Sequence, residues 1–185
     1  MNLFGTAGIR GDVVEDVTPE LAVAVGQAVG SLARADTKPS TADSDTPGDS
    51  EVVIGWDGRT TSPALASAVA SGVASAGAPV RRAGTVPTPT LAFASRGRYG
   101  IMVTASHNPP TDNGLKLFVD GVEFDRARER EVESTIEAGQ TPAEWNVWQT
   151  PTQVKPLPTY RKAVVDYARE YGEPLAGLAV VVDCG

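Results

Sequence analysis

Apolar segments of strand length alternate along this chain with segments whose apolar residues have helical spacing, and this alternation limits the folds open to it. Residues 51–55 have the length and apolar content of a short buried strand, and residues 99–104 and 115–119 resemble them. In the segments between, apolar residues recur every three or four positions, which is typical of amphipathic helices. Strands alternating with helices of this length predict an α/β domain whose helices pack on a sheet.

Two helices have clear start signals in the sequence. The first has Thr18 as its cap and Pro19 as its first residue, and its apolar spacing continues to Ala35. The second begins at Ser62-Pro63 and ends at Gly77. We also expect a strand over residues 79–83, a brief helix over 88–96, a charged surface helix over 126–138 and a further helix over 159–171.

A turn signal shows how the sheet is connected. Asp120-Gly121 separates the alternating segment 115–119 from residues 122–124, and this dipeptide is a strong signal for a hairpin. Hairpin strands are antiparallel, whereas strands joined through helices are parallel, so the sheet is predicted to be mixed. We therefore expect residues 1–140 to form a three-layer α/β/α domain with a mixed sheet.

The remaining segments suggest how the chain is divided. Residues 36–50 are polar and lack apolar periodicity, so they are expected to form a long exposed loop. Residues 141–158 contain several prolines and are expected to form a linker. Residues 159–185 are expected to be the truncated start of a second α/β domain, because the nearly all-apolar segment 178–183 is typical of a strand buried in a covered sheet.

Composition and charge exclude several functional classes. Hydrophobic residues make up 41% of the chain and charged residues 21%, which is enough for a packed core. The net charge of −7, from 23 acidic and 16 basic residues, argues against binding nucleic acid through a cationic face. This acidic excess fits either adaptation to high salt or a GC-rich genome.

Other features of the sequence concern location. No apolar run approaches the ~20 residues of a membrane span, and no signal peptide is visible at the N-terminus. The single cysteine, Cys184, excludes an intrachain disulfide. We expect a cytoplasmic protein, and the sequence does not indicate its oligomeric state.

The most informative motif is the run Thr-Ala-Ser-His-Asn-Pro-Pro at residues 104–110. It directly follows a predicted strand, and ligands of α/β sheets collect at the carboxyl ends of strands. Ser106 is followed by His107, the one histidine in the chain, and Asn108 with Pro109 favours a turn that presents the serine hydroxyl. An ordinary turn is the simplest alternative. A serine hydrolase is disfavoured, because the G-x-S-x-G motif is absent and adjacent Ser and His rarely form a nucleophile–base pair.

Four segments together carry a family resemblance. Residues 104–109 resemble the phosphoserine loop of the α-D-phosphohexomutase superfamily, which includes phosphoglucomutase, phosphomannomutase and phosphoglucosamine mutase. Residues 4–11 resemble its N-terminal active-site loop, residues 55–59 its second loop, and residues 113–116 the segment that follows the phosphoserine. The resemblance covers the whole chain, with residues 36–50 as an insertion.

The resemblance implies a role for each site residue. Phospho-Ser106 would give its phosphoryl group to a hexose monophosphate, moving phosphate between the 1- and 6-hydroxyls through a bisphosphate intermediate. A phosphoserine carries about −1.5 to −2 charges, so cations must surround it. The expected catalytic residues are Ser106, Lys116, Arg10 and His107, and the expected substrate- or phosphate-binding residues are Thr6, Arg59 and Asn108.

Several of these residues also have a simpler interpretation. Arg10 suits a phosphate because a guanidinium binds two oxygens at once, but it is also a candidate structural arginine. Lys116 is the expected proton shuttle if it is buried beside other cations, and otherwise a surface lysine. A structural role for His107 stays open. For Arg59, bracing of the loop together with Asp57 ranks before contact with phosphate.

The resemblance also implies Mg²⁺, held in this family by the phosphoserine and three carboxylates of an Asp-Gly-Asp-Gly-Asp-Arg loop. That loop is absent from this chain, which leaves Ser106, through its phosphate, as the expected metal ligand. Octahedral Mg²⁺ needs several oxygen ligands, so we expect this chain alone to be inactive. The sequence does not specify which hexose phosphate is the substrate, and the alternative function is a non-catalytic sugar-phosphate-binding domain.

Overall fold

The computed structural model describes residues 2–5, 8–36, 50–172 and 176–183. Its helices are α1 (Pro19–Ala35), α2 (Ser62–Ser75), α3 (Thr88–Ala94), α4 (Arg126–Glu137), the 3₁₀ turn η1 (Trp145–Val147) and α5 (Pro156–Arg169). Its strands are β1 (Ile9–Asp12), β2 (Val52–Trp56), β3 (Val80–Thr85), β4 (Tyr99–Val103), β5 (Asp112–Val119), β6 (Val122–Glu123) and β7 (Thr152–Gln153).

The strands form one mixed sheet. Its order is β1-β5-β4-β2-β3-β7, and β6 pairs with β5 beside this path. Strand β2 runs parallel to both β3 and β4, whereas β5 runs antiparallel to β4, β1 and β6. The predicted mixed sheet is therefore confirmed, and so is the hairpin, in which Asp120 and Gly121 have φ angles of 50° and 80°.

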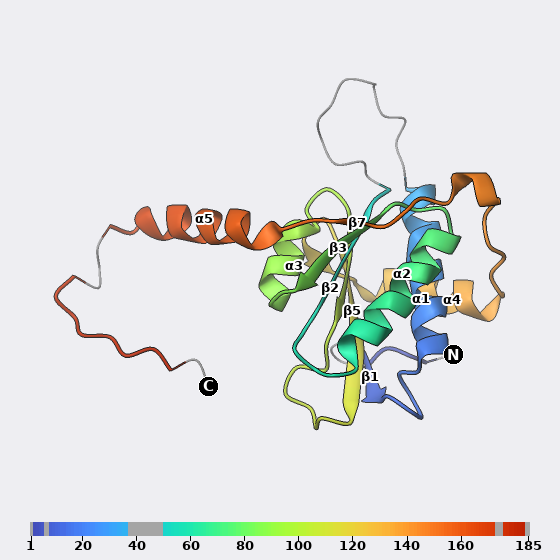
Figure 1. Ribbon diagram of the computed structural model, residues 1–185, viewed down its shortest axis with the longest axis horizontal. Helices are drawn as coiled ribbons and strands as arrows, with labels where there is room; N and C mark the ends of the chain where they lie inside the picture. The colour runs from blue at the N-terminus through green and yellow to red at the C-terminus, as the bar shows by residue number, and fades with distance from the viewer. Residues whose placement is uncertain (1, 6–7, 37–49, 173–175, 184–185) are drawn as a thin grey trace, which may run out of the picture.

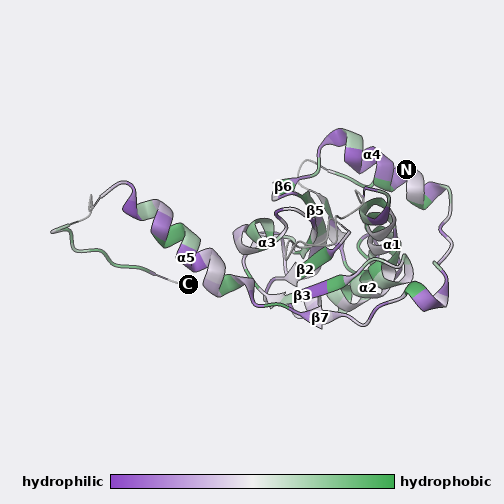
Figure 2. Cartoon of the chain, turned by 90° about the horizontal axis from the view of Figure 1, so that it is seen from above, coloured by the Kyte–Doolittle hydropathy of each residue, from purple (hydrophilic) through white to green (hydrophobic). Residues whose placement is uncertain are grey.

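Helices cover both faces of the sheet, which gives the predicted α/β/α layers (Figure 1). Buried residues of α1, α2 and α4 form the larger core cluster on one face, together with Val52, Ile54, Ile101 and Leu117. Leu91 of α3 belongs to the smaller cluster on the other face. Figure 2 shows the sheet between α3 and the pair α1 and α2.

Successive side chains of the central strands point to opposite faces of the sheet, so each strand contributes residues to both core clusters. In β2, Val52 and Ile54 belong to the larger cluster, whereas Val53 belongs to the smaller one. In β4, Met102 likewise belongs to the smaller cluster, whereas its neighbours Ile101 and Val103 belong to the larger one. Because a strand covered on both faces buries every side chain, it is a continuous apolar segment in the sequence.

Helices α1 and α2 approach each other through glycines. A Cβ added to Gly72 of α2 would lie 2.1 Å from the carbonyl oxygen of Val23 in α1. A Cβ on Gly26 of α1 would lie 2.3 Å from the carbonyl oxygen of Val69 in α2. The two helix backbones are thus in direct contact, and only glycine fits at these two positions.

The start and the end of α1 are both fixed by side chains. Thr18 caps its first turn, because its hydroxyl accepts a hydrogen bond from the Leu21 amide at 3.3 Å. At the other end, the Asp36 carboxylate accepts hydrogen bonds from the Tyr99 hydroxyl and from Arg128. Burial and this carboxylate raise the pKa of Tyr99 well above its ordinary value. Helix α1 is thereby tied to both β4 and α4.

The structure differs from the sequence-based expectations in three places. Strand β1 begins within residues 4–11, the segment expected to form the N-terminal active-site loop, and pairs at the sheet edge with β5. Strand β7 lies within the expected linker and pairs with β3. Helix α5 begins at Pro156 rather than at 159, because proline suits the first turn of a helix.

The strand expected over residues 178–183 is wrong for the structure described. These residues are exposed and belong to no strand of the described sheet. An apolar segment forms a strand only where a neighbouring strand satisfies its backbone hydrogen-bonding groups, and none lies beside it here. In Figure 1 this segment follows α5, which projects from the domain beside α3.

Two further expectations concern the chain as a whole. Most of the loop expected over residues 36–50 lies outside the described residues.

Among the described helices, none has both the length and the apolar character required to cross a membrane.

Candidate active site

The serine loop begins where β4 ends. The Ser106 amide donates a hydrogen bond to the Thr104 hydroxyl at 2.9 Å, and the Asn108 amide donates to the Ala105 carbonyl at 3.1 Å. These bonds make a tight turn in which Ser106 has a positive φ of 58°. Ser106 and His107 are both exposed, so the turn presents the serine hydroxyl to solvent at the carboxyl end of a central strand, as the sequence predicts.

His107 lies beside the serine hydroxyl. Its Nδ1 is 3.3 Å from Ser106 Oγ, within hydrogen-bonding distance. The arrangement supports a role for His107 at this hydroxyl, which was one of the two alternatives that the sequence left open.

Lys116 lies on β5, between two core residues. Leu115 and Leu117 are buried in the larger core cluster, and Lys116 points to the other face of the sheet. Its Nζ is 3.1 Å from a carboxylate oxygen of Glu123 on β6. The described ion-pair partner of Lys116 is thus an acid, and the presence of other cations beside Lys116 stays a prediction.

Glu123 is a site residue that the sequence reasoning missed. It lies opposite Phe118 across the hairpin, so it is a diagonal neighbour of Lys116. The hairpin signal at Asp120-Gly121 was sufficient to predict this pairing, because a two-residue turn fixes the register of both strands.

Arg10 lies on β1, opposite Gly114 on β5. Its Nε is buried and has no hydrogen-bond partner among the described residues. Gly114 permits the close approach: a Cβ there would lie 2.8 Å from the Thr104 carbonyl oxygen and 2.9 Å from Arg10 Cγ. The arginine side chain is thus packed against the strand end from which the serine loop begins.

Arg59 is directed into the serine loop. Its Nη atoms donate hydrogen bonds to four backbone carbonyl oxygens, and its Nε is 3.3 Å from the Asp57 carboxylate. A guanidinium has five N–H groups, and here the four hydrogen bonds donated by its two Nη atoms all go to protein carbonyls. This geometry favours the bracing role over direct contact with phosphate. Asn108 is similarly engaged, because its side-chain amide donates to Asp112 at 3.0 Å.

Asp57 is held by a small polar network. Its carboxylate accepts hydrogen bonds from the Ser62 hydroxyl at 2.6 Å and from the Arg59 amide at 3.0 Å. Burial raises the pKa of Asp57, but hydrogen bonds from Ser62, the Arg59 amide and Thr104, together with the Arg59 charge, outweigh burial and lower the pKa overall. Asp57 is therefore a carboxylate at neutral pH, and it can orient the guanidinium.

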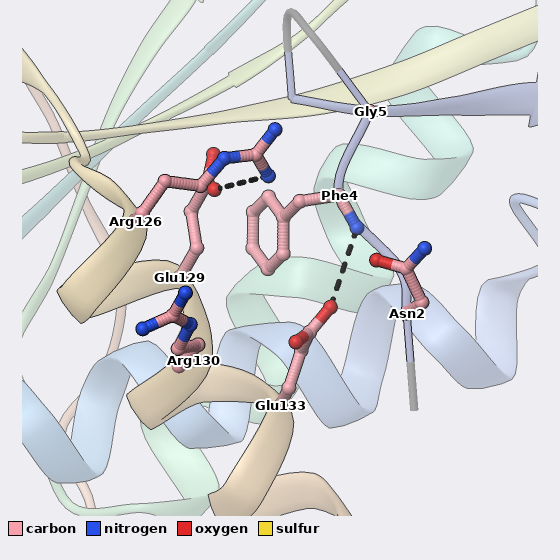
Figure 3. A pocket seen from close by; sticks show the side chains of 7 residues that line it. All are labelled: Asn2, Phe4, Gly5, Arg126, Glu129, Arg130 and Glu133. Carbon is pink, nitrogen blue, oxygen red and sulfur yellow. Dashed lines mark hydrogen bonds and ion pairs between the residues drawn. The ribbon is translucent and has the colours of Figure 1, made fainter.

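Helix α4 anchors the chain that leads into the N-terminal loop. A carboxylate oxygen of Glu133 accepts hydrogen bonds from the amides of Leu3 at 2.7 Å and Phe4 at 3.4 Å. Figure 3 shows Glu133 beside Phe4, in a pocket that also contains Arg126 and its ion-pair partner Glu129. The sequence indicated only a surface helix here. Thr6, expected to bind substrate, lies outside the described residues.

Comparison with known proteins identifies the family. The sequence model described as phosphoglucomutase/phosphomannomutase, alpha/beta/alpha domain I, matches residues 1–143. The chain belongs to this family. The expected family is thus confirmed, and residues 1–143 correspond to the first domain of a phosphoglucomutase/phosphomannomutase protein.

Relatives of this family share much of the chain. A phosphopentomutase from Thermococcus kodakarensis is 44% identical over 171 residues, which is 90% of this chain and 35% of that protein. A phosphoglucosamine mutase from Symbiobacterium thermophilum is 36% identical over 188 residues, which is 99% of this chain and 40% of the relative. The chain thus spans well under half the length of either relative.

A solved structure agrees with this fold. A phosphoglucomutase/phosphomannomutase family protein from Burkholderia thailandensis superposes with a TM-score of 0.73 and 29% sequence identity, covering 89% of this chain and 35% of that one. The α/β/α domain described above therefore has the architecture of this family.

The family implies a metal, and the described residues do not fit a complete site for one. Among the described parts of the chain, no group of three or more His, Cys, Asp or Glu side chains is placed to hold a metal ion. Ser106 would contribute one ligand through a bound phosphate, whereas octahedral Mg²⁺ requires several.

Proposed function

We propose that this chain serves as the phosphoryl-carrying domain of a sugar-phosphate mutase, with Ser106 as the carrier. The observation that supports this most is the position of Ser106: an exposed hydroxyl in a tight turn at the end of β4, 3.3 Å from His107 Nδ1. The membership of the phosphoglucomutase/phosphomannomutase family agrees with this role. We also propose that the complete protein containing this domain is a sugar-phosphate mutase.

The reaction consists of two phosphoryl transfers. In the first, the bond between Ser106 Oγ and phosphorus breaks and Ser106 Oγ takes up a proton, while a bond from phosphorus to a sugar hydroxyl oxygen forms and that hydroxyl loses its proton to a base. The product is a sugar bisphosphate. In the second, Ser106 Oγ attacks the other phosphate, the serine proton is taken up, and a sugar hydroxyl leaves with a proton. The enzyme returns to its phosphorylated state with the phosphate moved along the sugar.

The residues of this chain supply three parts of that chemistry. Lys116 is the proposed group that takes and returns the proton, and Glu123 holds its Nζ in place. Arg10 is the proposed partner of the transferred phosphoryl group, because its buried Nε lacks a hydrogen-bond partner among the described residues and an anion would satisfy it. His107 is proposed to hydrogen-bond the phosphate on Ser106. Charge neutralisation and positioning are what phosphoryl transfer mainly requires.

The substrate class follows from the relatives. Proteins named phosphoglucosamine mutase and phosphopentomutase both match the chain. A hexose phosphate is the proposed substrate, with transfer between the 1- and 6-hydroxyls. A pentose phosphate is the second candidate, and the 44% identity to the Thermococcus phosphopentomutase favours testing it. Mg²⁺ is the metal we propose for the complete enzyme.

Replacing the serine hydroxyl tests this proposal. In the complete mutase, Ser106→Ala should abolish turnover of glucose, glucosamine, mannose and ribose phosphates, while the melting temperature stays near that of the wild type. Intact-mass measurement after incubation with a sugar bisphosphate should show one phosphate on the wild type and none on Ser106→Ala. Thr111→Ala, which removes another exposed hydroxyl near the loop, is the matched control and should keep both properties.

Two results would count against the proposal. Full activity of Ser106→Ala would show that the serine is not the carrier. A phosphate mapped to a different residue would assign that role elsewhere. If the wild type binds sugar phosphates but neither turns them over nor becomes phosphorylated, the non-catalytic binding domain is the better description.

A further inference from the structure

The backbone of Ser106 requires an explanation. Ser106 and Asp120 are the residues other than glycine that have a positive φ in the described chain. Asp120 lies in a hairpin turn, and Asp tolerates the left-handed region. Ser106 lies outside any hairpin turn, and a non-glycine residue keeps such a conformation only where surrounding contacts maintain it. The hydrogen bonds of the Ser106 and Asn108 amides within the turn are joined by contacts from outside it.

Arg59 supplies these contacts from a different segment of the chain. Its Nη2 donates to the Ser106 carbonyl at 3.0 Å and to the Asn108 carbonyl at 2.7 Å. Its Nη1 donates to the Pro109 carbonyl at 2.6 Å and to the Asp112 carbonyl at 3.0 Å. The Arg59 guanidinium thus donates hydrogen bonds to four carbonyl oxygens, including that of Ser106 itself.

The guanidinium is itself fixed on the opposite side. Asp57 faces its Nε at 3.3 Å, and Asp57 is in turn bonded to the buried Ser62 hydroxyl at 2.6 Å. Ser62 accepts a hydrogen bond from the buried side-chain amide of Asn113 at 2.9 Å. The side chain of Arg59 is only 15% exposed. Through Asp57, Ser62 and Asn113, the Arg59 guanidinium is thus connected to the start of α2 and to β5.

This arrangement leaves no Nη hydrogen of Arg59 for a phosphate, because both Nη atoms already donate to loop carbonyls, and the Nε faces the Asp57 carboxylate. A lysine cannot replace it either, since an ammonium has three donors on one atom and cannot span four carbonyl oxygens and a carboxylate.

From this geometry, we infer that Arg59 is a positioning residue for the phosphoryl carrier: its guanidinium holds Ser106 in the left-handed conformation that aims the serine hydroxyl at substrate. The inference rests on the proposed role of Ser106. Arg59 acts through the loop backbone and does not touch the transferred group. Its loss should reduce kcat rather than substrate affinity.

The test compares Arg59→Lys with Arg98→Lys. Arg98 is a matched arginine: its side chain is 17% exposed and pairs with Glu51 at 2.6 Å, at the opposite end of β4. In the complete mutase, Arg59→Lys should lower kcat about 100-fold, as expected for a misplaced reacting group, and change KM less than threefold. Arg98→Lys should keep kcat. Asp57→Asn, which weakens the hold on Arg59, should give a smaller loss in the same direction.

A second readout uses no turnover. In the 185-residue chain, backbone NMR should show faster amide hydrogen exchange for Ser106 and Asn108 in Arg59→Lys than in the wild type or in Arg98→Lys. Amides of the central strand β4 should stay protected in all three proteins. If Arg59→Lys unfolds the chain, Asp57→Asn is measured in its place.

The outcomes separate the two proposals. Unchanged kcat in Arg59→Lys, or unchanged exchange in the loop, would overturn the positioning role. A raised KM with normal kcat would instead indicate direct binding of substrate by Arg59. A third outcome is that amide hydrogen exchange in the loop changes as expected while the wild type carries no phosphate on Ser106. In that case the contacts of Arg59 with the loop are a structural feature, and the carrier role of Ser106 is wrong.

Discussion

The side-chain amide of Asn113 donates a hydrogen bond to the hydroxyl of Ser62 at 2.9 Å, and both residues are fully buried below the serine loop. Asn113 also donates to Thr61 at 2.9 Å and accepts from the Gly114 amide at 2.8 Å. A buried polar group of this kind stabilises a fold only while its partners are present. The pair links the start of α2 to β5, far apart in the sequence.

Removal of that amide should destabilise the domain. Asn113→Ala leaves Ser62, Thr61 and the Gly114 amide short of a partner, and each such loss costs about 1–3 kcal/mol. We expect the free energy of unfolding to fall by about 3 kcal/mol or more in urea titrations of the 185-residue chain. Ser71→Ala, which removes an exposed hydroxyl of α2, is the control and should change it by less than about 0.5 kcal/mol. Equal effects would contradict the role of the buried network.

The close contact between α1 and α2 predicts how a methyl group added at Gly72 changes the stability of the domain. Gly72→Ala favours the helix by about 1 kcal/mol through propensity, but its Cβ would meet the Val23 carbonyl at 2.1 Å. Because overpacking costs about 1–3 kcal/mol and backbone atoms cannot move aside easily, we expect net destabilisation of about 2 kcal/mol. Gly58→Ala, which meets nothing within 4 Å, serves as the control. A more stable Gly72→Ala would show that the helices separate at little cost.

The lowered pKa of Asp57 predicts a pH dependence with a definite sign. A carboxyl group whose pKa is lower in the folded state stabilises the fold above its unfolded pKa of about 3.9, and this contribution is lost as the pH falls through the folded value. Stability from Asp57 should therefore be constant from about pH 5 to 8 and decrease below about pH 4. Urea unfolding from pH 2.5 to 7 should show a shallower acid limb for Asp57→Asn. Parallel curves would contradict this assignment.

Lys116 should matter for the rate rather than for the fold. Its side chain bonds to Glu123 at the sheet surface, so Lys116→Met should cost little stability. As the proposed proton shuttle it should lower kcat of the complete mutase about 10²–10⁴-fold, the usual contribution of a general acid–base. The measurement is a pH–rate profile beside a thermal melt. A kcat within threefold of the wild type would remove Lys116 from the mechanism.

Residues 1–185 by themselves should not interconvert sugar phosphates. They supply the proposed carrier Ser106, the cation Arg10 and the shuttle Lys116, and the described residues hold no cluster suited to a metal. Orientation of a substrate accounts for about 7–11 kcal/mol of a barrier, and the proposed roles of these three residues all concern the transferred phosphoryl group. An assay of glucose, glucosamine, mannose and ribose phosphates with Mg²⁺ and a sugar bisphosphate checks this. Turnover close to that of an intact mutase would contradict it.

The apolar periods of the sequence were sufficient for most of the fold. The Thr18 cap, the strand at 52–56 and the Asp120-Gly121 turn are local signals, because helix caps, buried strands and two-residue turns depend on residues close together in the chain. The segment 178–183 shows the limit of such signals, since it is as apolar as β2 but pairs with no strand among the described residues.

The sequence by itself determined the α/β class and the motif that presents Ser106. Only the tertiary structure decided the contacts of the candidate site residues: the guanidinium of Arg59 on four carbonyls, the carboxylate of Glu123 at Lys116, and the buried Nε of Arg10, which has no hydrogen-bond partner among the described residues. The first and last of these involve segments about 50 to 100 residues from the serine along the chain. The physical reason is that a hydrogen bond depends on distance and angle in space, and the pairing of strands β1, β2, β4 and β5 in one sheet sets those distances.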